Sequence, residues 1–364
     1  MMSSRELNGR TEALKTERAV EELRRGRAIE LVEGSNRWII AAVETLEPPL
    51  FSQLKSLHGS KIRLLMTAQR AEAAGFSKNL DIPIEIEFTN HIDLEEIRSF
   101  AGLRPTISDK KSLKIAPSKN PITTTAAFQL AKLGRLLPAL LSMPSKESFD
   151  SNVMSIDITD IDGSKSICHI LKIISRARVP LIETVSCEMV LFRQQHGFGE
   201  HLAIIIGPLD SQQITPVRLH SACLTGDLLG SLRCDCGDQL KRAVNRIASF
   251  GAGVLLYLDQ EGRGIGLANK LRAYALQDTG LDTLDADQHL GFLPDERTYE
   301  VAAAMLEKLD INRINLLTNN PSKINALREY GIDVVGRLPL VASVNSHNQR
   351  YLKAKLDRAG HLAE

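Results

Sequence analysis

The second half of the chain alternates short apolar runs with longer amphipathic segments. Apolar runs of a few residues predict strands, and apolar positions three or four residues apart predict helices. The predicted strands are 201–207, 216–222, 253–258, 314–320 and 332–340, and the predicted helices are 236–251, 269–280, 296–310 and 321–331. Because strands and helices alternate, we expect a largely parallel sheet with helices on both faces.

The first half shows a less regular version of the same pattern. A charged helix is expected at 11–27, before a strand at 28–32. Further strands are predicted at 38–46, 61–66 and 153–160, with helices at 48–59, 68–76 and 123–141. The Pro-, Ser- and Lys-rich stretch 101–121 is interpreted as a loop. We therefore expect an α+β layer arrangement in this half.

The two patterns predict an α/β protein of two domains. A chain of 364 residues is long enough for two ordinary domains, each with its own core. The change in regularity near 175–182 places the boundary so that the domains cover residues 1–177 and 178–364.

Composition points to a small ligand. Lys and Arg (45) nearly balance Asp and Glu (44), so no overall field attracts nucleic acid or an acidic membrane. The first 26 residues contain no apolar signal region, and no uncharged run approaches the ~20 residues that span a bilayer. The sequence predicts a cytoplasmic protein with no membrane partner.

Three of the five cysteines lie within fourteen positions: Cys223, Cys234 and Cys236. In a reducing compartment, clustered thiols are more often metal ligands or catalytic groups than disulfides. Three thiolates leave the fourth tetrahedral position of Zn²⁺ open for water, as in catalytic zinc sites; a fourth thiolate or a histidine could instead complete a closed site. The alternative is three small buried hydrophobes, and the spacing favours metal. Cys168 and Cys187 are assigned to packing.

Three further motifs lie in the second half. Gly262, Gly264 and Gly266 form a Gly-rich turn in which the backbone can approach a phosphate, although a turn without a ligand is an equal alternative. Asp295 and Arg297 lie two residues apart where a loop enters the predicted helix 296–310, and Asp295 could simply be the helix cap. The stretch LLTNNPSK lies where ligands bind in open parallel sheets, but a lysine there is often a solvated charge.

Taken together, RLHSACLTGDLLGSLRCDCGDQL, LDQEGRGIGLANKLRAYALQDTGLDT, HLGFLPDER and LLTNNPSK resemble GTP cyclohydrolase II. The resemblance covers residues 180–364, with the motifs in order and at the expected spacing. This family opens the guanine ring of GTP in riboflavin biosynthesis, releasing formate, pyrophosphate and 2,5-diamino-6-(5-phosphoribosylamino)pyrimidin-4-one.

The resemblance also implies a role for each matching residue. One Zn²⁺ per chain would be held by Cys223, Cys234 and Cys236, and Mg²⁺ would accompany the triphosphate. Asp295 would be the proton acceptor, Arg297 would attack the α-phosphorus, and Tyr274 would lie near the base. The GTP-binding residues would be Arg218, His220, Ser221, Gln239, Glu261, Gly262, Arg263, Thr283, Thr318 and Lys323. The family also implies a homodimer.

Two positions depart from the family pattern. Ala222 stands where the family usually has Glu, and Asp259 where it usually has Arg. An aspartate facing a triphosphate would be unfavourable. Two alternatives therefore stay open: a related enzyme that takes another nucleotide or stops before deformylation, and a non-catalytic GTP-binding protein.

The first half resembles 3,4-dihydroxy-2-butanone 4-phosphate synthase, in its pattern more than in its motifs. The acidic loop of that family is reduced to EGSNRW, and its Gly-His-Thr-Glu motif aligns with Ile122, Thr123, Thr124 and Thr125. Without those carboxylate and imidazole groups, a Mg²⁺-dependent rearrangement lacks its ligands and its proton carriers. We expect an inactive domain that supports the dimer or the second domain; a new ligand site is the other alternative.

Overall fold

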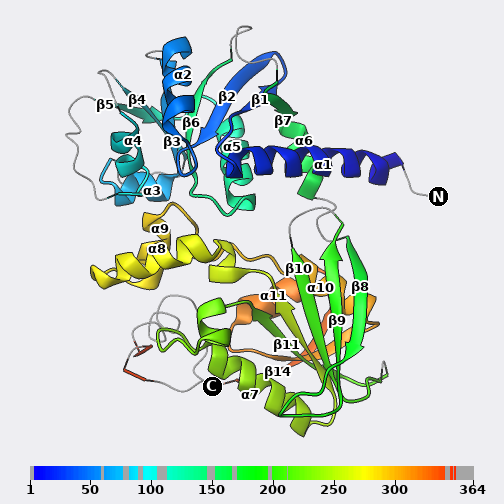
Figure 1. Ribbon diagram of the computed structural model, residues 1–364. Helices are drawn as coiled ribbons and strands as arrows, with labels where there is room; N and C mark the ends of the chain where they lie inside the picture. Colours follow the sequence, from blue (N-terminus) through cyan, green and yellow to red (C-terminus); the bar gives the residue numbers. More distant parts are fainter. Residues whose placement is uncertain are drawn as a thin grey trace. The chain divides into compact units, whose positions relative to one another are not determined.

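The computed structural model describes residues 4–58, 61–76, 82–88, 93–104, 113–145, 152–165, 170–195, 199–210, 212–340, 345–346 and 348–349. The chain forms two compact units, and each contains one seven-stranded sheet (Figure 1). The first unit comprises Met1–Ile167 together with Ala268–Glu296, and the second comprises Cys168–Leu267 together with Arg297–Glu364. This division differs from the expected limits of 1–177 and 178–364, because a segment of the second half groups with the first unit.

The sheet of the first unit has the strand order β5-β4-β3-β6-β2-β1-β7, in which only β1 and β7 pair in parallel. Its strands are β1 (Ile29–Glu33), β2 (Asn36–Ala42), β3 (Arg63–Met66), β4 (Ile84–Phe88), β5 (Leu113–Pro117), β6 (Ala139–Pro144) and β7 (Met154–Asp157). Its helices are α1 (Ser4–Arg24), α2 (Pro48–His58), α3 (Ala68–Ala73), α4 (Leu94–Phe100), α5 (Pro121–Leu133), α6 (Ile158–Lys165), α8 (Leu267–Asp278) and α9 (Thr283–His289).

Alternate residues of these strands enter two separate cores. Leu64 and Met66 pack on one face with α2, α3 and α4, whereas Leu65 packs on the other with α1, α5 and α6. This is the period of two expected for a strand that is buried on both faces. The expected α+β architecture of the first half is therefore present.

Two expectations for the first half need correction. The predicted helix 123–141 is too long, because α5 ends at Leu133 and the chain turns through Gly134 and Arg135 into β6. Pro138 precedes that strand, and a proline is a poor continuation for a helix. The predicted loop 101–121 contains β5, which pairs with β4 although four of its five residues are exposed.

The sheet of the second unit has the strand order β14-β13-β11-β12-β10-β9-β8. Its strands are β8 (Leu171–Arg178), β9 (Cys187–Gln194), β10 (Glu200–Ile206), β11 (Thr215–Ser221), β12 (Gly253–Leu258), β13 (Arg313–Leu317) and β14 (Asp333–Leu338). Its helical elements are η3 (Leu224–Leu228), α7 (Cys236–Ser249), η4 (Glu261–Gly264), α10 (Glu300–Lys308) and α11 (Pro321–Glu329).

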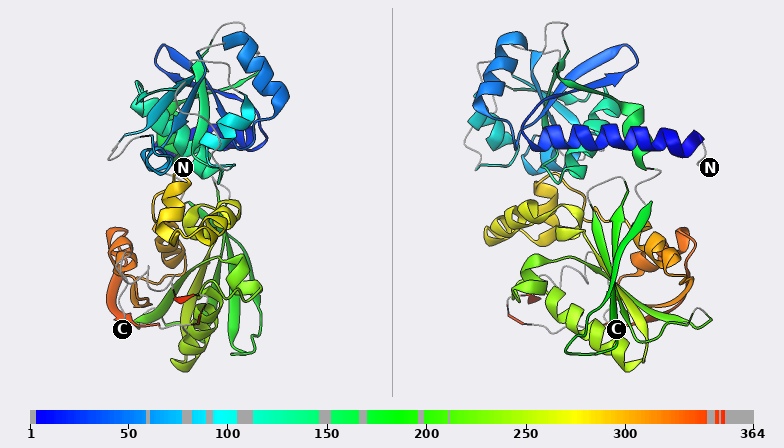
Figure 2. Two further views of the ribbon diagram at one scale, coloured as in Figure 1. Left: turned by 90° about the vertical axis from the view of Figure 1, so that its left-hand side faces the viewer. Right: turned by 45° about the vertical axis from the view of Figure 1, so that its right-hand side comes forward.

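The parallel pairing predicted from the alternating pattern is present in β11 to β14. Strands β8, β9 and β10 follow one another without helices and pair antiparallel. Helix α7 covers one face of the sheet, and α10 with α11 covers the other (Figure 2). Parallel strands with helices on both faces bring their carboxyl ends to one edge, where ligands bind in such sheets. None of the helices in the described ranges combines the length and apolar character that crossing a membrane requires.

Leu256 tests the core of the second unit. It is fully buried on β12, the central strand, so Leu256→Ala should lower the free energy of unfolding by about 2–5 kcal/mol through lost burial and a cavity. Urea denaturation measures the change. Val335→Ala is the control, because Val335 on the edge strand β14 is 46% exposed and its truncation should cost much less. Equal losses in the two variants would contradict the packing described above.

Candidate active site

The candidate site is built on the carboxyl ends of the parallel strands β11, β12 and β13. Cys223 follows β11, Glu261 follows β12, and Thr318 follows β13. The amide of Ala222 donates to the carbonyl of Leu258 at 2.8 Å, which extends the pairing of β11 and β12 to the edge of the sheet. The strand ends therefore hold three loops that carry predicted site residues.

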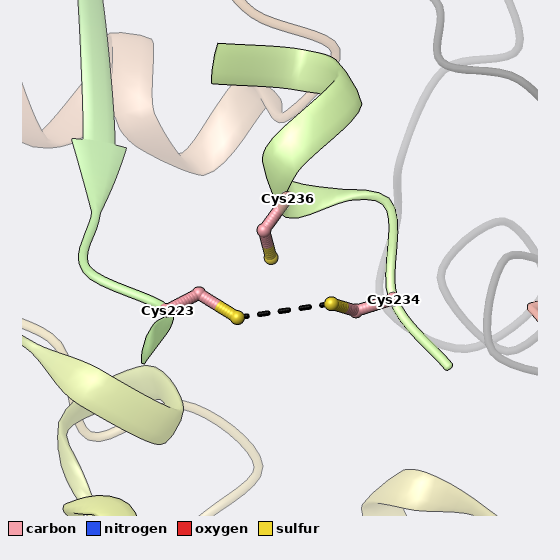
Figure 3. Close-up of side chains that lie close together, drawn as sticks. All are labelled: Cys223, Cys234 and Cys236. Atoms are coloured by element: carbon pink, nitrogen blue, oxygen red, sulfur yellow. Dashed lines mark hydrogen bonds between the residues drawn. The ribbon is translucent and has the colours of Figure 1, made fainter. Parts of the chain in front are cut away.

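The three clustered cysteines converge: Cys223 follows β11, Cys234 precedes α7 and Cys236 is the first residue of α7 (Figure 3). Their sulfur atoms all lie within 4.8 Å of one another, and Cys223 Sγ is 3.7 Å from Cys234 Sγ. Tetrahedral Zn²⁺ with Zn–S bonds of about 2.3 Å would place two sulfurs about 3.8 Å apart. The donor set and its spacing therefore fit one thiophilic metal ion.

The thiols influence one another's protonation. A hydrogen bond with Cys223 and burial together raise the pKa of Cys236 well above its usual value, and a hydrogen bond with Cys223 also raises the pKa of Cys234. A metal ion requires thiolates, so it must displace these protons to bind.

Gly226 allows the three cysteines to approach one another. It lies in η3, a π-helical turn directly after Cys223. A Cβ atom at Gly226 would lie 2.7 Å from Cys234 Sγ and 3.0 Å from both Cys223 Sγ and Cys236 Cβ. A Cβ at Gly237 would in turn lie 2.3 Å from the carbonyl oxygen of Gly226. Two glycines are therefore required by close packing around the cluster.

Asp227 fixes the first cysteine against the sheet. Its carboxylate accepts from the backbone amide of Cys223 at 3.0 Å and from the hydroxyl of Tyr257 on β12 at 2.9 Å. The same carboxylate lies 3.0 Å from His220 Nε2 on β11, and the His220 ring stacks on Tyr257 with centroids 5.6 Å apart. Burial lowers the pKa of His220, so the ring is neutral near pH 7 and Nε2–H is its donor to Asp227.

Arg218 and Gln239 form a second chain of contacts. The buried Arg218 guanidinium donates to the carbonyl of Leu317 at 2.9 Å and to Gln239 Oε1. Gln239 Nε2 donates to Asp235 Oδ2. Burial lowers the pKa of Arg218 to about 10, which leaves it charged at neutral pH. Both ends of the Gln239 amide are thus oriented.

Glu261 connects the Gly-rich turn to the cysteine loop. Its Oε2 accepts from the amide of Leu224 at 2.6 Å, and its Oε1 accepts from the amide of Gly262 at 2.9 Å. Gly262 has φ +62° and Arg263 has φ +59°, a backbone conformation that is unfavourable for a residue with a side chain. The carboxylate of Glu261 therefore has a structural role, and the strained turn that follows presents Arg263.

The third loop contributes buried polar residues. Thr318 is 1% exposed, and its Oγ1 accepts from the amide of Asn320 at 3.0 Å. Lys323 in the first turn of α11 donates to the carbonyl of Leu219 at 3.1 Å, so it is not the solvated lysine of the alternative interpretation. Among the described residues, Ser221 Oγ and His220 Nδ1 are buried polar atoms without a hydrogen-bond partner. Buried polar atoms of this kind are stabilised when a ligand pairs with them.

Three predicted site residues belong to the first unit. Tyr274 lies on α8, Thr283 is the first residue of α9, and Asp295 lies exposed shortly after α9. Arg297 belongs to the second unit, where its guanidinium lies 5.8 Å from the Tyr299 ring centroid. The interpretation of Asp295 as a helix cap is wrong, because α10 begins at Glu300 and its cap residue is Tyr299.

Neither departure from the family pattern disrupts the local backbone. Ala222 keeps its strand-like hydrogen bond to Leu258, and the amide of Asp259 donates to His201 Nδ1 at 3.1 Å. Cys187 is buried in the core beneath α7, as expected for packing. Cys168, also assigned to packing, lies outside the described residues.

Sequence reasoning missed Asp227, Tyr257 and Gly226. Asp227 was visible only as part of the turn TGD, and its partners are set by the pairing of β11 with β12. Tyr257 looked like one more apolar residue of a buried strand. A polar group near the end of such a strand is the signal that could have identified it.

Comparisons with known proteins point in one direction. Residues 172–339 match the family model described as GTP cyclohydrolase II. The chain is 37% identical over 359 residues to a GTP cyclohydrolase-2 of Xylella fastidiosa (strain 9a5c), covering 97% of this chain and 88% of that protein. It is 39% identical over 359 residues to a GTP cyclohydrolase-2 of Azospirillum brasilense, covering 95% of this chain and 93% of that protein. It is also 49% identical over 175 residues to the riboflavin biosynthesis protein RibBA of Endomicrobium trichonymphae, covering 48% of this chain and 43% of that protein.

Gly226→Ala should abolish metal binding at the cysteine cluster, because the added methyl group would lie against two of the three sulfurs. Metal content is measured by elemental analysis after purification with zinc. Gly230→Ala is the matched control: Gly230 has φ +65°, but a Cβ there meets nothing within 4 Å, so this variant carries only the backbone cost. Full zinc content in Gly226→Ala would show that the cluster does not bind metal as described.

Metal affinity should fall as the pH is lowered. Because their pKa values are raised, the thiols are protonated and protons compete with the metal. For each proton that the metal displaces, the apparent affinity should fall about tenfold when the pH is lowered by one unit. Competition with a chromophoric chelator between pH 6 and pH 8 measures the slope. An affinity independent of pH would contradict thiol ligation.

Proposed function

The chain belongs to the GTP cyclohydrolase II family and is an enzyme, and from this we propose that it hydrolyses GTP to 2,5-diamino-6-(5-phosphoribosylamino)pyrimidin-4-one, formate and pyrophosphate. The observation that carries the proposal is the cysteine cluster at the carboxyl edge of the sheet, with sulfurs 3.7 Å apart beside the buried Arg218–Gln239 pair. This reaction would supply the first step of riboflavin biosynthesis.

Zn²⁺ held by Cys223, Cys234 and Cys236 would supply Lewis acidity and lower the pKa of a coordinated water. The protein's part is to fix the ligands. Asp227 holds the backbone of Cys223 through its amide, and Gly226 leaves the space in which the sulfurs converge.

Recognition of the guanine base is assigned to Gln239. Its amide oxygen accepts from Arg218 and its nitrogen donates to Asp235, so the amide cannot flip without losing both bonds. An oriented amide presents a fixed pattern of donor and acceptor, which is what discrimination between purine edges requires. Arg218 acts through Gln239 and so serves as a positioning residue.

The triphosphate requires positive charge at the same edge. Lys323 and Arg263 supply it, Thr318 adds a hydroxyl group, and Mg²⁺ would accompany the phosphates. Ser221 Oγ and His220 Nδ1 are the buried polar atoms that GTP would pair with. On the family pattern, Arg297 attacks the α-phosphorus as pyrophosphate leaves, Asp295 accepts a proton, and Tyr274 and Thr283 contact the nucleotide.

The first half is proposed to be a synthase-like domain without synthase activity. Thr123, where the family motif has histidine, donates to Glu33 Oε2 at 2.6 Å. Thr124 Oγ1 lies 2.7 Å from Ser118 Oγ in a buried position. These hydroxyl groups are engaged within the protein and offer no general base. We also propose a homodimer, as the family resemblance implies.

The zinc-loaded protein should release formate and pyrophosphate when incubated with GTP and Mg²⁺. Cys234→Ser should lower the rate by at least about a thousandfold, because the metal-activated water is lost. Formate dehydrogenase coupling and mass spectrometry of the pyrimidine measure both products. Cys187→Ala is the control, since Cys187 lies outside the cluster.

Three results of this assay would point elsewhere. Turnover of another nucleotide in place of GTP would favour a related enzyme with different specificity. Pyrophosphate without formate would indicate that the reaction stops before deformylation. GTP binding without either product, at full zinc content, would contradict the proposed function and favour a non-catalytic nucleotide-binding protein.

A further inference from the structure

Residues 268–296 carry Tyr274, Thr283 and Asp295, three residues that the family resemblance assigns to the reaction, yet they belong to the first compact unit. We propose that the first unit fixes the conformation of this segment, which the proposed reaction uses, and that Arg70 is its main positioning residue. This inference rests on the proposed function and assigns a role to the half of the chain that lacks synthase chemistry.

Arg70 lies on α3 and is 2% exposed. Its Nε and Nη2 donate to the carbonyl of Phe100 at 3.0 and 2.9 Å, and Nη1 donates to the carbonyl of His289 at 2.9 Å. Phe100 and His289 are the last residues of α4 and α9. One buried guanidinium therefore satisfies carbonyls at the carboxyl ends of two helices, where helix dipoles favour positive charge.

The surroundings of Arg70 leave little room for another arrangement. Thr67 Oγ1, at the cap of α3, donates to the carbonyl of Gly291 at 3.0 Å. A Cβ at Gly291 would lie 2.8 Å from Thr67 Oγ1, and a Cβ at Gly102 would lie 3.0 Å from Arg70 Cζ. Burial lowers the pKa of Arg70 to about 10, so the guanidinium remains charged at neutral pH. The end of α9 is thus attached by charge-assisted hydrogen bonds and by close packing.

A second attachment holds the start of α8. Asn269 is fully buried, and its Nδ2 donates to the carbonyl of Arg135 at 2.9 Å. Arg272 donates to Asn269 Oδ1 at 2.6 Å and to Glu44 Oε1 at 2.8 Å. Glu44 Oε2 accepts from the amide of Leu137 at 2.8 Å. Tyr274 lies two residues beyond Arg272 on the same helix.

A third attachment lies at the end of the segment. Lys132 Nζ of α5 is 2.6 Å from Glu296 Oε1, which also accepts from the amide of Leu293 at 2.8 Å. Asp295, the proposed proton acceptor, is the neighbour of Glu296. The segment is therefore held at the start of α8, at the end of α9 and at Glu296, and the three attachments described above come from residues 44–137 of the first half.

Arg70→Met in the full-length, zinc-loaded protein tests the proposal. It should lower kcat for formate release on the order of 10- to 100-fold, because small misplacement of reacting groups has effects of that size. Zinc content should stay at one per chain, since the cysteines are elsewhere. Hydrogen exchange should accelerate in peptides covering 283–292. Arg70→Lys should restore part of the rate by keeping the charge.

Two controls separate positioning from general destabilisation. Arg63→Met removes an arginine on β3 whose ion pair with Glu85 lies within the first unit, and it should leave kcat within about twofold. Ile86→Ala destabilises the core of the first unit without removing an attachment. If Arg70→Met does not fold, the same measurements are made on Thr67→Val and on Arg272→Met, each of which removes a single attachment.

Unchanged kcat with unchanged exchange in Arg70→Met would overturn the proposal. So would an equal loss of kcat in Ile86→Ala at matched stability. A wild-type protein that releases no formate would refute the proposed function alone, because the exchange measurement then decides whether Arg70 holds the segment.

Discussion

The candidate site depends on one carboxylate, that of Asp227. It receives hydrogen bonds from Tyr257 on β12 and from the backbone of Cys223, and it lies within hydrogen-bond distance of His220 on β11. Two parallel strands and the first sulfur ligand are thereby fixed to the same side chain. Because Cys223 is held in this way, η3 can bring Gly226 against Cys234, and the remaining thiols converge on a position that the sheet defines.

Much of this could be predicted from the sequence, because local pattern and local chemistry agree in the second half. The strands β11 to β13 and the helices α7, α8 and α11 lie where hydrophobic periodicity placed them. The cysteines converge as their spacing indicated. The strands β8 and β9 were missed because their apolar residues are interrupted by charge, and they pair by long-range contacts that no local window contains.

The residues that sequence reasoning missed act through contacts that exist only once the chain has folded. Gly226 is needed because of the sulfur atoms of Cys223 and Cys234, three and eight residues away along the chain, and Arg70 because two helices end beside it. Neither requirement leaves a mark in composition or periodicity. The sequence also gives no sign that residues 268–296 belong to the first unit. Their pattern predicts ordinary helices, and buried polar groups attach them to that unit.

The attachment of α9 has a consequence for how the chain reaches its native state. Arg70 and His289 are separated by 219 positions in the sequence. During synthesis, the carbonyl of His289 is therefore made long after the Arg70 guanidinium that donates to it. Domains usually fold as continuous units while they emerge from the ribosome. Here the first unit cannot be completed in that order. A chain cut between the two halves would place the buried Arg70 guanidinium and its acceptor at His289 on different fragments, and would do the same to the fully buried Asn269 amide and its acceptor at Arg135.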